Sequence, residues 1–166
     1  MTRTPQEATE IEKFALNVTI PILRDTVNGV GLLATGTLFE IAERQFIVTA
    51  RHIFDDVRDL TALAFPENPM KGSLHTFGSF ELVKPAEEHV DIAVMELKET
   101  ATISKLKDGW QFLSLSNVAL PSTTLNDGAF FLSGYPASLT QESGGWLRGA
   151  RVTAYLRNQN RYFECK

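Results

Sequence analysis

Short runs of β-branched and aromatic residues recur along most of the chain, and turn-forming residues such as Gly, Pro, Asn and Asp separate them. Runs of this kind are typical of β-strands, and their short, regular spacing favours a sandwich or a barrel over a parallel sheet with crossover helices. The predicted strands are 18–23, 31–41, 45–49, 61–65, 74–83, 92–97, 112–115, 128–132, 150–156 and 161–165. The sequence therefore predicts an all-β fold.

Helical signals are sparse. Acidic residues followed by apolar ones predict a short helix over 9–16, and one helical turn is predicted over 53–57. The segment 98–110 is polar and lacks strand periodicity, which is typical of a connection between units. A domain break is therefore expected in this segment.

Charge and composition argue against several classes of protein. Sixteen basic and twenty acidic residues give a net charge of −4, and no two basic residues are adjacent, so nothing indicates a nucleic-acid-binding face. No apolar run approaches the length of a membrane span, and the polar first ten residues do not resemble a signal peptide. The single cysteine, Cys165, cannot form an internal disulfide. These features predict a cytoplasmic protein without nucleic-acid or membrane partners.

A histidine follows a predicted hairpin over 36–49. The second strand of this hairpin is apolar enough to be buried, and the small residues Thr49 and Ala50 allow the chain to turn tightly after it. His52 then lies between a rigid strand and a helical turn, the kind of support that a general base needs. The alternative is a histidine that only ends a strand.

An aspartate opens the predicted strand 92–97, whose residues alternate toward a core. Alone, Asp91 is an ordinary strand-entry residue. A catalytic histidine, however, needs a carboxylate on Nδ1 to fix its tautomer and stabilise the imidazolium. His52 and Asp91 therefore form a candidate pair.

Four short motifs resemble landmarks of trypsin-like (chymotrypsin-fold) serine peptidases of the bacterial type, and they occur in the order of that family. They are Gly36-Thr37, Thr49-Ala50-Arg51-His52, Asp91-Ile92-Ala93-Val94 and Ser133-Gly134-Tyr135-Pro136. The resemblance implies a chymotrypsin-like double antiparallel β-barrel with the active site between the barrels. It also implies that His52 is the general base and that Asp91 orients it.

The same resemblance divides the chain into three parts. Residues 1–17 are an N-terminal extension or short helix, 18–100 form a complete first barrel carrying His52 and Asp91, and 101–166 form a linker and part of a second barrel. The implied activity is hydrolysis of a peptide or protein substrate by a His-Asp-Ser triad. Substrate preference cannot be read from the sequence, because the segments around and after the serine build that pocket in the family.

The nucleophilic serine is where the chain departs from the family. The family pattern is Gly-x-Ser-Gly-Gly, and the only Ser-Gly-Gly in this sequence is Ser143-Gly144-Gly145. Glu142 would place a carboxylate beside the developing oxyanion, where negative charge opposes the transition state. Six residues separate Pro136 from Ser143, whereas the family places several strands there. Ser143 is therefore a weak candidate nucleophile, and a polar turn is the better interpretation.

The remaining reactive side chains suggest no second site. Cys165 lacks a Gly-x-Cys-Gly setting and is expected to be a core or edge residue of strand 161–165. His75 and His89 are expected at the surface. The spacing of the histidines and the cysteine matches no zinc pattern, and phosphate-binding glycine motifs are absent. No metal or cofactor is predicted.

Two explanations for the absent serine stay open. In one, the chain is part of a longer peptidase whose serine segment lies beyond Lys166, and that segment is a partner of this chain. In the other, the protein is a natural serine-less relative that binds a peptide or protein. A third possibility is an antiparallel β interaction domain with accidental motifs. The chain alone is expected to be inactive as a peptidase.

Overall fold

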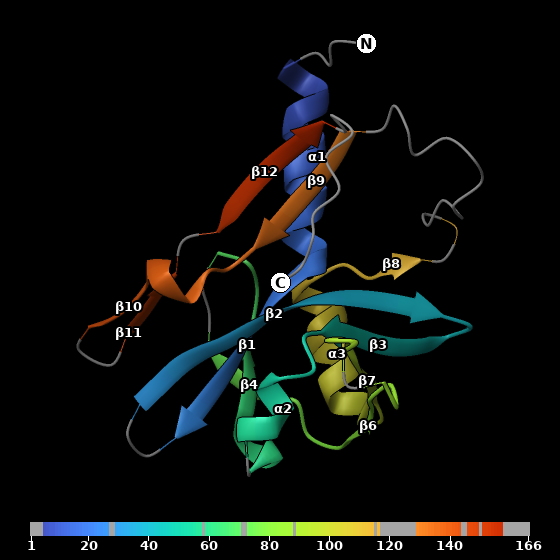
Figure 1. Cartoon of the computed structure of the whole chain (residues 1–166), viewed down its shortest axis with the longest axis vertical. Coiled ribbons are helices and arrows are strands. Elements are labelled where there is room, and N and C mark those ends of the chain that lie inside the picture. The colour runs from blue at the N-terminus through green and yellow to red at the C-terminus, as the bar shows by residue number, and fades with distance from the viewer. Residues whose placement is uncertain are drawn as a thin grey trace.

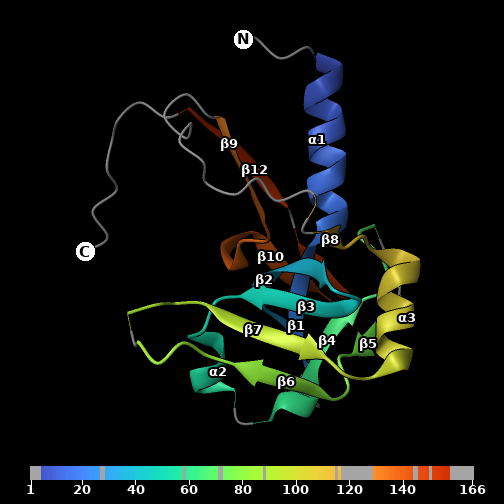
Figure 2. The ribbon, with the colours of Figure 1, turned by 90° about the vertical axis from the view of Figure 1, so that its right-hand side faces the viewer.

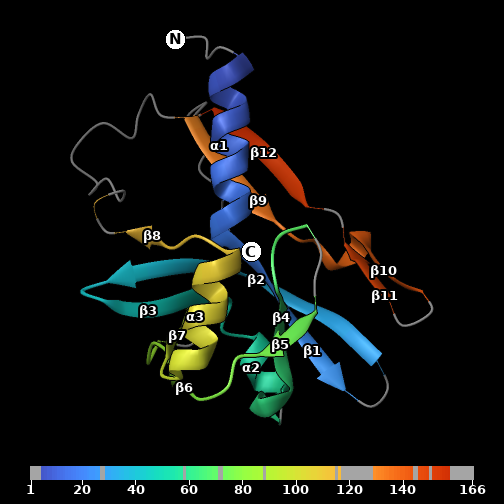
Figure 3. The same ribbon diagram turned by 180° about the vertical axis from the view of Figure 1, so that it is seen from behind.

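The computed structural model describes residues 5–26, 29–57, 59–70, 73–87, 89–114, 116, 129–143, 146–149 and 151–157. They form a mostly antiparallel β structure with few helices, as the sequence predicts (Figure 1). A large curled sheet occupies one end, and helix α1 extends away from it beside one of the smaller strand pairs, as the rear view in Figure 3 also shows.

The elements follow the predicted order with some differences. The helices are α1 (Pro5–Val18), α2 (Ile53–Asp56) and α3 (Thr100–Gly109), with 3₁₀ turns η1 (Leu60–Ala62) and η4 (Ala137–Leu139). The strands are β1 (Thr19–Thr26), β2 (Gly29–Ile41), β3 (Arg44–Thr49), β4 (Leu63–Pro66), β5 (Leu74–Thr76), β6 (Phe80–Val83), β7 (Ala93–Leu97), β8 (Leu113–Ser114), β9 (Ala129–Gly134), β10 (Thr140–Ser143), β11 (Trp146–Gly149) and β12 (Val152–Arg157).

The large sheet has the strand order β5-β4-β1-β2-β3-β7-β6, and all these neighbours are antiparallel. The short strand β8 adds a parallel pairing to the end of β2. The order places β3 between β2 and β7, so the strand that leads to His52 has paired neighbours on both sides. Figure 2 shows β3, β7 and β6 side by side, with α3 next to them.

The two ends of this sheet, β5 and β6, are consecutive in the sequence. A single strand is predicted over 74–83, but the structure divides it because Gly78 adopts a left-handed φ of 63°. The turn favours a glycine because a side chain at this φ would be strained, whatever space surrounds it. The backbone N–H of Phe77 still donates to Leu63 O (3.1 Å), and that of Lys98 to Ser79 O (3.1 Å). The divided segment thus contacts β4 on one side and the end of β7 on the other.

The core lies inside the curl of the large sheet. Strand residues that alternate inward fill it, together with apolar residues of α2 and α3. The fully buried side chains of largest volume are Phe65, Phe77, Ile20, Ile22, Leu38, Ile47, Leu63, Met95 and Leu106. Because these residues come from β1, β2, β3, β4, β7, α3 and, for Phe77, the turn between β5 and β6, the core connects nearly all elements between 19 and 109.

Helix α3 was not predicted; it lies in the polar segment 98–110, where a domain break was expected. Thr102 and Leu106 are buried on one face of α3, and Trp110 directly after the helix is buried as well, so this face packs on the sheet core. The Trp110 indole N–H also donates to Pro66 O at 2.9 Å. This segment is therefore an integral part of the packing around the sheet. Helix α1 is also longer than the predicted 9–16.

The described residues after 128 form two separate antiparallel strand pairs, β9 with β12 and β10 with β11. The hairpin β10–β11 was not predicted; only a polar turn was expected there. Arg151 ties this part to helix α1 by donating to Glu12 O at 3.0 Å. The predicted strand 161–165 lies outside the described residues.

Candidate active site

His52 is fixed from both sides by the chain around it. On one side, strand β3 lies between β2 and β7, and the Thr49 hydroxyl donates to Thr35 O at 2.9 Å. On the other side, α2 begins directly after His52, and the N–H of Asp55 donates to His52 O at 3.0 Å. Ile53 and Phe54 of α2 are buried in the core. The backbone of His52 is therefore well anchored although its side chain reaches solvent.

Asp91 reaches His52 because strands β3 and β7 are neighbours. Their antiparallel pairing ends at Thr49↔Ala93. Asp91 precedes β7 by two residues, and His52 follows β3 by three, so both lie beyond the same end of the paired strands. Strand register thus brings together two residues that are 39 positions apart.

Both carboxylate oxygens of Asp91 contact His52. The His52 Nδ1 atom lies 2.7 Å from Asp91 Oδ2, and the His52 backbone N–H donates to Oδ1 at 2.9 Å. The predicted side-chain contact is therefore present at hydrogen-bonding distance. Because a carboxylate only accepts hydrogen bonds, Nδ1 carries the proton, and the neutral ring has its lone pair on Nε2.

The electrostatics of this pair favour an ionised aspartate. The pKa of Asp91 is lowered first by the hydrogen bond from the His52 backbone N–H and second by the His52 side chain, while partial desolvation opposes them. A carboxyl group whose pKa is lower in the folded than in the unfolded state stabilises the fold at pH values above its ordinary pKa. This stabilisation is lost as the pH falls through the folded-state pKa. The side chains of His52 and Asp91 are 69% and 55% exposed, in contrast to the buried aspartate of a serine peptidase triad.

The other predicted site residues are not joined to this pair by the contacts described. The backbone of Ser143 ends strand β10 opposite Trp146, and its side chain lies outside the described part of the structure. Cys165 also lies outside the described residues. His89 is exposed, as expected, whereas His75 is half-buried with its ring 5.7 Å from that of Phe65. The role of Ser143 therefore stays a prediction.

A surface groove of about 400 Å³ lies between β2 and the strand pair β9–β12. Thr35, Leu132, Tyr135, Pro136 and Val152 are among its lining residues, and Leu132 and Val152 are exposed. The backbone N–H of Tyr135 donates to Thr35 Oγ1 at 2.8 Å, which ties the predicted 133–136 motif to β2. Thr35 also accepts a hydrogen bond from the Thr49 hydroxyl through its backbone oxygen. This groove-lining residue is therefore bonded to β3, the strand that leads to His52.

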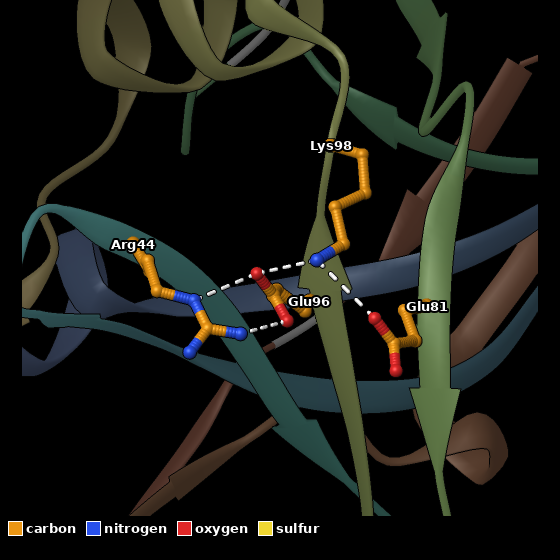
Figure 4. A network of polar contacts seen from close by, with 4 residues as sticks. All are labelled: Arg44, Glu81, Glu96 and Lys98. Atoms are coloured by element: carbon orange, nitrogen blue, oxygen red, sulfur yellow. Dashed lines mark hydrogen bonds and ion pairs between the residues drawn. The ribbon is translucent and has the colours of Figure 1, made fainter.

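Sequence reasoning missed a network of charged residues across β3, β7 and β6 (Figure 4). Arg44 binds Glu96 through two hydrogen bonds, of which the Nε–Oε1 contact is 2.8 Å. Lys98 lies 2.6 Å from Glu96 Oε1 and 3.2 Å from Glu81 Oε2. The signs alternate along the network, and the nearly buried Glu96 has a cation on each side. The opposite charges on neighbouring strands were a usable signal only once the strand pairing was known.

Acidification tests the contribution of Glu96 to stability. Its pKa is lowered from 4.5 to about 2, mainly by the hydrogen bond from Arg44 and then by that from Lys98. Stability from this group is therefore present above pH 4.5 and is lost as the pH falls toward about 2. We expect urea unfolding to show that Glu96→Gln weakens the fold near neutral pH and flattens this acid dependence.

Glu81→Gln is the matched control for this experiment, because it removes a more exposed carboxylate of the same network. It should leave most of the acid dependence in place. Equal acid dependence in the wild type and in Glu96→Gln would contradict the assignment.

Two further structural properties bear on the kind of site this is. Among the described residues, no cluster of three or more His, Cys, Asp or Glu is placed to hold a metal ion. Within the same part of the chain, every helix is too short or too polar to cross a membrane.

No protein-family model matches the chain, and no curated protein matches it in sequence.

Proposed function

We propose that this chain is the His-Asp-bearing part of a trypsin-like serine endopeptidase. The observation that carries the proposal is the double contact of Asp91 with His52, at 2.7 Å to Nδ1 and 2.9 Å to the backbone N–H. A carboxylate on Nδ1 is what a triad histidine requires, because it fixes the tautomer and stabilises the imidazolium. A histidine that only ended a strand would not require such a partner.

In the proposed reaction, His52 Nε2 accepts the proton of a serine hydroxyl as that oxygen attacks the peptide carbonyl. The protonated ring then gives the proton to the leaving amine, and Asp91 stabilises the imidazolium between the two steps. A segment other than the described residues of this chain supplies the serine and the oxyanion donors. His52 and Asp91 alone then provide a base but no nucleophile.

The strand arrangement supports a chymotrypsin-like barrel for this proposal. In the order β4-β1-β2-β3-β7, the outer strands β4 and β7 are bridged by the divided segment of β5 and β6. A ring of six antiparallel strands results if β5 and β6 count as one strand. The pairs β9–β12 and β10–β11 would belong to the second barrel, and the groove beside Thr35 would lie where the two barrels meet.

The second candidate function is a serine-less module that binds an extended peptide or a protein. The groove favours this candidate, because it exposes Leu132 and Val152 next to Thr35 of β2, whose carbonyl accepts a hydrogen bond from Thr49 of β3. Apolar side chains of a peptide could enter it while the peptide backbone pairs with a free strand edge. The two candidates differ in whether a reactive serine ever comes within reach of His52 Nε2.

Labelling with a serine-directed phosphonate distinguishes these functions. We expect no labelling and no peptide hydrolysis by the 166-residue chain, because loss of the nucleophile costs a triad enzyme about 10⁶ in rate. The full-length product of the gene should be labelled at one serine, and His52→Ala should abolish the labelling. His75→Ala is the matched control and should leave it intact.

Three results would count against the proposal. Labelling of the isolated chain at Ser143 would show that this chain carries its own nucleophile. Labelling of the full-length product that survives His52→Ala would separate the serine from His52. The absence of any labelled serine in the full-length product would favour the peptide-binding module.

A further inference from the structure

The segment that carries Asp91 has little regular structure to hold it in place. Strand pairing between β3 and β7 ends at Thr49↔Ala93, before either His52 or Asp91 is reached. Between β6 and β7, the described residues 84–87 and 89–92 belong to no helix or strand. The position of Asp91 relative to His52 therefore depends on contacts made by side chains and by local turns.

Arg51 makes such contacts from the residue next to His52. Its Nη1 atom donates to Pro85 O at 3.2 Å and to Glu87 O at 3.1 Å. Glu87 O also accepts the backbone N–H of Val90 at 3.1 Å, which closes a turn. Asp91 follows Val90 directly, so a single guanidinium nitrogen holds the turn that leads into the carboxylate.

We infer that Arg51 is a positioning residue that sets the Asp91 carboxylate against His52. Its side chain acts through the 85–91 segment. Arg51 and His52 are consecutive, and the helical turn after them is anchored in the core by Ile53 and Phe54. The backbone that carries Arg51 is therefore held in place together with that of His52. The Arg51 side chain connects this backbone to the segment that carries Asp91.

Lys84 gives the same segment a second attachment at its far end. Its Nζ atom lies 3.0 Å from Asp55 Oδ1 in α2. This contact holds the start of the segment, seven residues before Asp91, whereas Arg51 holds the turn directly before it. Loss of Arg51 should therefore disturb the dyad more than loss of Lys84.

Hydrogen exchange of the His52 backbone N–H tests this inference. That N–H donates to Asp91 Oδ1, so its protection reports whether the carboxylate is in place. Arg51→Met keeps the apolar stem and removes the donors. We expect it to speed exchange at His52 roughly tenfold, the effect of losing about one hydrogen bond's stabilisation. Arg51→Lys should restore protection, because one ammonium can also donate to both carbonyl oxygens.

Lys105→Met is the matched control, because it removes a cation of α3 whose described polar contact is with His75. Amides within β3, such as those of Ile47 and Val48, report global stability and should be unchanged in Arg51→Met. Unchanged exchange at His52 would overturn the inference, and so would equally faster exchange in β3. The catalytic meaning of Arg51 rests on the proposed peptidase function, but this measurement needs no serine and no hydrolysis, so the two can fail separately.

Discussion

Asparagine at position 91 should reverse the tautomer of His52. In the structure, Asp91 accepts two hydrogen bonds from His52, one from the backbone N–H and one from Nδ1. An asparagine has one accepting oxygen and one donating amide group. The His52 backbone N–H can only donate, so the asparagine oxygen must stay beside it. The asparagine NH₂ group then faces Nδ1 of the His52 ring. A ring that accepts at Nδ1 carries its proton on Nε2.

This reversal removes the lone pair that a serine hydroxyl would need. In an enzyme that contains the complete proposed triad, Asp91→Asn should lower kcat by about 10⁴, the loss known for the same change in a serine peptidase triad. The fold should persist, because the two side chains have nearly the same shape and the site is exposed. The expected loss is therefore chemical and not a loss of folded protein.

Nitrogen NMR of the imidazole ring measures the tautomer directly in the 166-residue chain, at a pH where the ring is neutral. The wild type should show the proton on Nδ1 and the variant should show it on Nε2. Asp59→Asn is the matched control, because Asp59 is an exposed carboxylate whose described hydrogen bonds are to Thr61. A ring that stays protonated at Nδ1 in Asp91→Asn would refute the assigned contact.

The pairing of His52 with Asp91 was predictable because strands place residues in a repeatable way. Each residue lies near an apolar run that predicts a strand, 46–48 before His52 and 92–97 after Asp91. Periodicity alone could not show that these two strands are neighbours, since strand pairing is not local in sequence. The resemblance to a known family supplied that step, and the register Thr49↔Ala93 is consistent with it.

Other features were missed for identifiable physical reasons. Helix α3 has a weak apolar stripe, because one of its buried positions is occupied by Thr102. A threonine counts as polar in a hydrophobicity pattern, so the helical periodicity is hard to recognise in the sequence. The hairpin β10–β11 had a usable signal, since a Gly-Gly pair between short polar–apolar runs is typical of a two-residue turn. The contacts of Arg51 are with backbone carbonyls of an irregular segment, whose positions no residue pattern specifies.

The second large effect is expected at Gly36, in the strand that packs on β1 and β3. A Cβ atom added there would lie 2.5 Å from Ile47 Cγ2, 3.2 Å from Ile22 Cδ1 and 3.4 Å from Ile20 Cγ2. All three isoleucines are fully buried, and their β-branched side chains have little freedom to move aside. Gly36→Ala should therefore lower the free energy of unfolding by about 1–3 kcal/mol, as overpacking of a core does.

Strand β2 also offers the matched control for this substitution. Gly31 lies in the same strand, but a Cβ atom added there would meet nothing within 4 Å. Gly31→Ala should leave stability unchanged or raise it by up to about 1 kcal/mol, because alanine restricts the unfolded chain more than glycine does. Denaturant unfolding of the two variants separates a steric effect at one site from a general intolerance of alanine in β2.

A double-mutant cycle then identifies the colliding atom. Ile47→Ala removes Cγ2, the nearest atom to the new methyl group, at a cost of its own of about 2–5 kcal/mol. If this contact causes the loss, Gly36→Ala should cost clearly less in the Ile47→Ala background than in the wild type, with a coupling of about 0.5–3 kcal/mol. Additive losses would show that the added methyl group does not meet Ile47. That result would contradict the close contact between β2 and β3 at this position, which helps to hold the strand leading to His52.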